Sequence, residues 1–177
     1  DPTGRVGVLG RQFGHCLAHG AGNPAALALS RLRSFRALSP SPSELLERGF
    51  SALILAAEIT ADRFGLLACQ DIHAMLRTEL VTLTGLNSEV ITWETNAYLA
   101  QCRSDLERLL TQGIGAGSHS EEGFRAYALS LFSETTLYRE LTGKGPGSRR
   151  LSDVESLLER IFRLTRGPAD VRLDHGR

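Results

Sequence analysis

The 177-residue sequence contains little of what identifies chemistry directly: one tryptophan, one methionine, three cysteines and 6% aromatic residues. It has no formal net charge at pH 7, which argues against a nucleic-acid binder held by bulk charge. Its longest unbroken apolar stretch, residues 52–57, is far shorter than the roughly 20 residues that cross a bilayer. The sequence therefore predicts neither membrane insertion nor nucleic-acid binding.

The three cysteines cannot all pair within one chain, so we expect no disulfide framework. Cys69 and Cys102 stand among apolar residues, where cysteine commonly acts as a small buried side chain. This usage favours a reducing compartment. We therefore expect an intracellular, cytoplasmic protein.

Cysteine and histidine spacing gives one metal-like pattern. Cys16 and His19 are three residues apart and Cys69 and His73 are four apart, so each pair can lie on one helical face. A zinc site formed by Cys16, His19, Cys69 and His73 is one interpretation. The other, which we favour because no short Cys-x-x-Cys pair occurs and nothing in the sequence shows that the two pairs meet, is buried cysteines beside partly exposed histidines. We expect no metal and no cofactor.

The signals that mark the starts and ends of helices are abundant. Four glycines each end an amphipathic run of about fifteen residues or more, as helix C-caps do: Gly85, Gly113, Gly143 and Gly167. Serine followed three residues later by glutamate, a helix-start pattern, occurs at residues 41–44, 118–121 and 152–155. No alternating strand pattern competes. The predicted helices span residues 24–39, 42–84, 87–112, 118–142 and 152–166, with a further short one at 11–19.

The fold class expected from these signals is all-α, a globular bundle of six or seven helices. Residues 45–83 are predicted to form a long, buried central helix, because apolar residues there cover most of the circumference, with a kink or break near residues 63–65. Residues 1–10 contain three glycines and are predicted to be a loop. The expected organisation is an N-terminal arm at 1–22, a helical domain at 23–167 and a polar tail at 168–177.

Charge is segregated along the chain. Residues 1–43 carry five arginines against one acid, residues 44–142 seven arginines against fourteen acids, and residues 143–177 eight bases against five acids. Such an arrangement suits pairing within one chain or between chains. Arg31, Arg33 and Arg36 lie around the predicted helix at 24–39, and they are our candidate contacts to a protein partner.

The sequence has no pattern typical of an enzyme. It lacks a Gly-x-Ser-x-Gly nucleophile elbow and a Glu-x-x-His pair, and its glycine-rich stretches at 113–118 and 143–148 are interpreted as linkers. We therefore expect a non-enzymatic protein-interaction domain, an adaptor, scaffold or regulatory subunit, that binds a protein partner or a second copy through apolar helix faces and segregated charge. The alternative is a sensing domain that holds a small apolar molecule between its helices.

Overall fold

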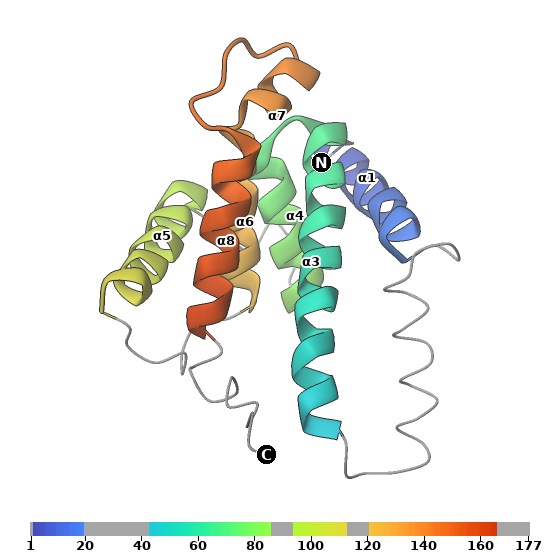
Figure 1. Ribbon diagram of the computed structural model, residues 1–177. Coiled ribbons are helices and arrows are strands. Elements are labelled where there is room, and N and C mark those ends of the chain that lie inside the picture. The colour runs from blue at the N-terminus through green and yellow to red at the C-terminus, as the bar shows by residue number, and fades with distance from the viewer. Residues whose placement is uncertain (1, 20–42, 86–93, 113–120, 166–177) are drawn as a thin grey trace, which may run out of the picture. The chain divides into compact units, whose positions relative to one another are not determined.

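Seven α-helices make up the part of the chain that the structure describes (Figure 1). The computed structural model describes residues 2–19, 43–85, 94–112 and 121–165. The prediction of an all-α fold is confirmed, and within these ranges the one β feature is an isolated bridge between Thr135 and Arg149. None of the described helices is both long enough and apolar enough to cross a membrane. The helices are α1 (Pro2–His19), α3 (Ser43–Cys69), α4 (Ile72–Thr84), α5 (Thr95–Gln112), α6 (Glu121–Ser133), α7 (Thr136–Leu141) and α8 (Leu151–Thr165).

The chain divides into two compact units. Unit 1, Asp1–Ile91, contains α1, α3 and α4, and unit 2, Thr92–Arg177, contains α5 to α8. This division falls inside the helical domain predicted for residues 23–167. The predicted boundaries at residues 22 and 168 lie outside the described residues.

Helix α1 replaces the loop that was predicted for residues 1–10. One continuous helix runs from Pro2 to His19, so the loop predicted for residues 1–10 is wrong and the short helix predicted at 11–19 is the second half of a longer one. The glycines recur at helical spacing and line the side of α1 that packs against α3 and α4. A Cβ atom at Gly10 would lie 2.5 Å from Ala68 Cβ, and one at Gly14 would lie 2.7 Å from Ala61 Cα. Glycine is needed here for close approach of two helices rather than for a loop.

Helix α3 continues through residues 63–65, where a kink or break was predicted, and the helical run ends at Cys69. Gln70 is left-handed, with φ of 56°, and Asp71 then caps α4 by accepting hydrogen bonds from the His73 and Ala74 amides at 2.9 and 3.1 Å. Gly65 serves packing instead, because a Cβ there would lie 2.5 Å from Met75 Cε. The interruption therefore falls at a residue type that seldom marks a helix end.

The core of unit 1 lies in the C-terminal half of α3 and the first half of α4. Ala61, Leu66, Met75 and Leu76 are almost completely buried. Leu53 and Ile54, predicted to belong to a helix buried all round, are 41% and 39% exposed. That expectation is wrong for this turn of α3.

Unit 2 contains two corrections to the predicted helices. Helix α5 ends at Gln112 as predicted but begins at Thr95, because Glu94 is not helical. The helix predicted for residues 118–142 is split into α6 and α7 at Thr135, whose hydroxyl donates to the Phe132 carbonyl at 2.7 Å and accepts from the Tyr138 amide at 3.2 Å. Leu141, the last residue of α7, is 62% exposed.

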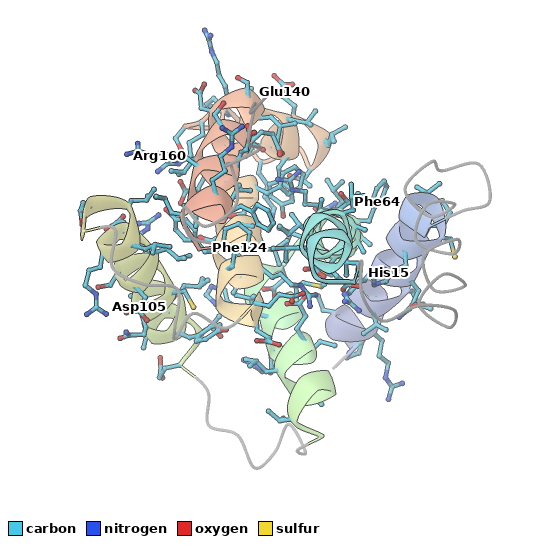
Figure 2. All side chains as sticks on the ribbon, turned by 60° about the horizontal axis from the view of Figure 1, so that its bottom comes forward. His15, Phe64, Asp105, Phe124, Glu140 and Arg160 are labelled. Atoms are coloured by element: carbon cyan, nitrogen blue, oxygen red, sulfur yellow. The ribbon has the colours of Figure 1, made fainter. Side chains whose placement is uncertain are left out.

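Helix α6 is the buried helix of unit 2. Seven of its residues are buried, among them Phe124, which Figure 2 shows on α6. Helices α5 and α8 both contact α6, and they contribute Leu106, Leu109, Val154, Leu158 and Ile161 to the core. Val154, Leu158 and Ile161 are almost completely buried. Helix α8 begins at Leu151, one residue before the predicted start at Ser152.

Candidate functional site

An apolar stripe runs along the outer face of α1. Its members, Val6, Leu9, Phe13 and Leu17, are 46%, 71%, 60% and 51% exposed. They supply four of the nine large hydrophobic side chains that are exposed among the described residues. Because the side chains are three or four residues apart, they share one side of the helix. We call this set the α1 stripe.

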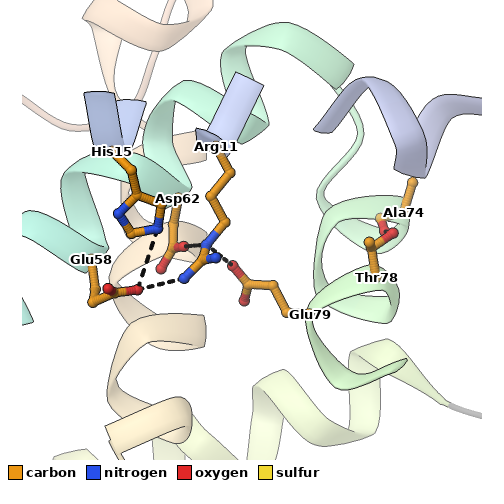
Figure 3. A network of polar contacts seen from close by, with 7 residues as sticks. All are labelled: Arg11, His15, Glu58, Asp62, Ala74, Thr78 and Glu79. Atoms are coloured by element: carbon orange, nitrogen blue, oxygen red, sulfur yellow. Dashed lines mark hydrogen bonds and ion pairs between the residues drawn. The ribbon is translucent and has the colours of Figure 1, made fainter. Parts of the chain in front are cut away.

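A polar network lies on the opposite side of α1, where the helix meets α3 and α4 (Figure 3). Arg11 Nε lies 2.7 Å from Asp62 Oδ1, and Arg11 also pairs through Nη2 with Glu58. Glu79 Oε1 lies 4.0 Å from Arg11 Nε, and His15 Nε2 lies 3.7 Å from Glu58 Oε2. Carboxylates from α3 and α4 therefore surround the guanidinium group that Arg11 contributes from α1.

The network contains one buried charge, Asp62, whose side chain is only 2% exposed. A buried carboxylate is tolerated when a cation and hydrogen bonds compensate the loss of water, and Arg11 supplies both. Arg11 is thus fixed toward α3.

The position of Arg11 determines which side of α1 faces outward. Residues two positions away on a helix point about 200° from one another. Leu9 and Phe13 stand two residues before and two after Arg11, so anchoring Arg11 inward turns both away from the polar network, although one edge of Phe13 still meets Phe64 of α3, with ring centroids 6.1 Å apart. The polar network and the α1 stripe are consequently two sides of one arrangement.

The candidate metal residues are spread over unit 1. Cys69 lies beside Gly7, where an added Cβ would be 3.4 Å from its Sγ, whereas Cys16 lies nine residues further along α1, about 13 Å by helical rise. Cys16 and His73 are exposed, and the side chain of His19 lies outside the described residues. Among the residues that the structure describes, no three His, Cys, Asp or Glu side chains form a group that could hold a metal ion.

The partner-contact candidates Arg31, Arg33 and Arg36 lie outside the described residues. Glu58 and Asp62 are four residues apart and so share one face of the predicted central helix, but the sequence analysis missed Arg11 and the α1 stripe. The available signal was the helical spacing of Gly4, Gly7, Gly10 and Gly14, which shows α1 to be a helix with a closely packed side.

In unit 2, residues 143–149 are tied to the junction between α6 and α7. The Ser148 and Arg149 amides both donate to the Glu134 carbonyl, and the Thr136 amide donates to the Arg149 carbonyl at 2.9 Å. The Glu134 carboxylate pairs with Arg149 at 2.7 Å and with Arg103 at 3.3 Å, and its hydrogen bond raises the pKa of Arg149. The stretch interpreted as a linker is a closed loop.

Two unit 2 side chains have pKa values shifted by burial. Removal from water raises the pKa of the Cys102 thiol and the pKa of the Tyr127 phenol, so both stay protonated at neutral pH. A protonated, buried thiol is a poor nucleophile, because the thiolate is the reactive form. The burial predicted for Cys102 is confirmed, whereas Cys69 is half-buried.

The fold and the surface define an all-α protein with a structured interhelical ion-pair network and an exposed apolar helix face. No protein-family model, curated protein or solved structure matches the chain.

Proposed function

We propose that the protein is a non-enzymatic protein-interaction domain, an adaptor, scaffold or regulatory subunit, that binds through the α1 stripe. The observation that carries this proposal is the row of half-exposed apolar side chains at positions 6, 9, 13 and 17. Anchors at i, i+3 and i+7 are the pattern by which amphipathic helices are recognised in protein complexes. Contiguous exposed apolar surface of this kind is typical of interaction sites.

The anchoring of α1 supports the same proposal. The Arg11–Asp62 pair and the close glycine contacts hold α1 in one rotation, so the stripe needs little ordering when a partner binds. Covering the exposed part of each anchor contributes about 1 kcal/mol, by the usual scale for apolar burial. Four anchors on one rigid helix supply a favourable term without any further rearrangement of the chain.

The absence of an activated group among the shifted side chains of unit 2 supports the non-enzymatic part. The thiol of Cys102 and the phenol of Tyr127 are buried and neutral, and Arg149 is more firmly cationic than an isolated arginine. Each is held in its least reactive state. In an interaction domain, Cys102 and Tyr127 need only pack in the core, and Arg149 needs only to form its ion pair.

Site-specific photo-crosslinking tests the proposal. A photoreactive amino acid replaces Leu9 in the full chain, and the matched control carries it at Glu155, which is exposed on α8. After irradiation in cell extract, we expect discrete adducts with a protein chain from position 9 and none from position 155. Adding Phe13→Asp to the position-9 variant should remove them. Equal adducts from both positions, or crosslinks within one chain only, would refute the proposal.

A further inference from the structure

We propose that His15 makes the attachment of α1 to α3 and α4 sensitive to pH, because its protonated imidazole is a second cation in the polar network. The proton should fasten α1 near about pH 6, and its loss should loosen α1 near about pH 8. This coupling stands on the geometry of the network. Its consequence, control of how firmly the α1 stripe is held for a partner, rests on the proposed function.

The polar network holds more negative than positive charge. Figure 3 draws three carboxylates near the guanidinium group of Arg11, those of Glu58, Asp62 and Glu79. In the part of the junction that the figure shows, one fixed cation therefore faces three anions. Carboxylates that are held close together and partly out of water repel one another, so a second cation at this junction stabilises it.

His15 lies where that second cation is needed. It follows Arg11 by about one turn of α1, so the two side chains share one side of the helix. The Nε2 atom of His15 lies 3.7 Å from Oε2 of Glu58, the oxygen that also accepts from Nη2 of Arg11. The His15 side chain is 20% exposed, so water reaches the imidazole while the contact with Glu58 stays partly shielded from solvent.

The direction of the effect follows from which charges move with α1. Arg11 repels a proton on His15 whether or not α1 is attached, because both residues belong to α1. The carboxylates of α3 and α4 face His15 only when α1 is attached. Attachment therefore favours the protonated imidazole, and by linkage the proton favours attachment.

The pH range follows from the chemistry of the groups. Imidazole side chains exchange their proton between about pH 5 and 8, where carboxylates are ordinarily ionised and guanidinium groups keep their charge. The stabilisation by protonated His15 is complete at the acid end of this range. It is lost as the pH rises through the range in which His15 releases its proton.

Hydrogen exchange of α1 peptides in the full chain, followed by mass spectrometry, tests the coupling. After correction for the intrinsic pH dependence of exchange, we expect protection to be about three- to tenfold higher at pH 6 than at pH 8. His15→Gln removes the ionisable group and should reduce this ratio to below about twofold. The matched control is His73→Gln, which removes an exposed imidazole from α4 and should keep the full ratio.

A variant with a fixed charge tests the same coupling from the other side. His15→Lys keeps a cation at both pH values, so α1 should be as protected at pH 8 as at pH 6. An equal ratio in the unmodified chain and in His15→Gln overturns the inference. Protection that rises toward pH 8 in the unmodified chain overturns it as well.

Photo-crosslinking from position 9 at the two pH values connects the coupling to binding. The yield of protein adducts should fall from pH 6 to pH 8 more steeply in the unmodified background than in His15→Gln. If exchange is independent of pH but position 9 still gives adducts, the inference fails and the proposed function stands. If exchange depends on His15 but no adducts form at either pH, the proposed function fails and the coupling stands.

Discussion

Unit 1 and unit 2 are both helical, yet different interactions hold them together. In unit 1, α1 meets α3 through glycines and small residues such as Ala61 and Ala68, and a buried ion pair crosses the contact. In unit 2, the contact surfaces of α6 are large side chains, and the ion pairs of Glu134 lie near the surface. One unit brings backbones close together, and the other interlocks side chains.

The difference determines what specifies each arrangement. Large side chains such as Phe124 and Leu131 fix the rotation of a helix by their shapes, because interiors are packed as tightly as organic crystals. A row of glycines offers little shape, so a helix packed on it needs another restraint against rotation. In unit 1 the Arg11–Asp62 pair provides it. Unit 1 should therefore respond to changes of charge and to added volume, and unit 2 to lost volume.

Removing the guanidinium group of Arg11 should have the largest effect. Arg11→Met keeps much of the side-chain length but leaves the Asp62 carboxylate buried without its cation, which costs about 3–5 kcal/mol. Hydrogen exchange of α1 peptides, followed by mass spectrometry, should show loss of protection in α1. The matched control is Arg103→Met in unit 2, whose 44% exposed side chain pairs with Glu134, and which should cost below about 1 kcal/mol. Equal losses of stability from Arg11→Met and Arg103→Met would show that the two units do not differ in how strongly they depend on an ion pair.

Lost volume should matter most in unit 2. Leu131 is completely buried in α6, so Leu131→Ala should lower the free energy of unfolding by about 3 kcal/mol through the cavity it leaves. Urea unfolding, with exchange of α6 peptides to locate the effect, measures it. The same substitution at exposed Leu9 in α1 should change stability by less than about 0.5 kcal/mol at dilute concentration. A large loss from Leu9→Ala would mean that the stripe is covered within one chain.

Added volume should matter most in unit 1. Gly10→Ala places a methyl group 2.8 Å from the Phe64 carbonyl oxygen, and overpacking of this kind costs about 1–3 kcal/mol. The better helix propensity of alanine returns about 1 kcal/mol, so we expect a net loss of up to about 2 kcal/mol. Thermal unfolding measures it, and Gln12→Ala, at an exposed position of the same helix, is the control that should not destabilise. A stabilising Gly10→Ala would show that α1 and α3 are not in close contact.

The behaviour of glycine explains how much of the fold the sequence predicts. Gly85 and Gly143 have φ of 66° and 68°, as expected for residues just past a helix end, while Gly113 and Gly167 lie outside the described residues. Gly10 and Gly65 lie inside helices because a neighbouring helix comes close. The sequence alone does not distinguish a glycine that ends a helix from a glycine that allows two helices to pack closely. Only the packing distinguishes them.

The candidate site was predictable in part only. The helical spacing places Glu58 and Asp62 on one face of α3, but nothing local shows that this face is covered. Arg11, the residue that covers it, is 51 positions from Asp62 in sequence. A periodic pattern describes a single helix, whereas the burial of a charge on that helix depends on which other helix packs against it. The outward stripe follows from that same contact, so it was missed together with it.

The junction between α3 and α4 gives the smallest predicted effect, and its sign is the opposite of the others. Gln70 adopts a left-handed conformation, which costs a residue with a side chain about 1–2 kcal/mol and glycine very little. Gln70→Gly should therefore raise the stability of unit 1 by about 1 kcal/mol in urea unfolding, after the added entropy of the unfolded chain is counted. Gln101→Gly, at an exposed position inside α5, should instead lose about 1 kcal/mol. If both glycine variants lose stability, residue 70 at the end of α3 is not held in the left-handed conformation.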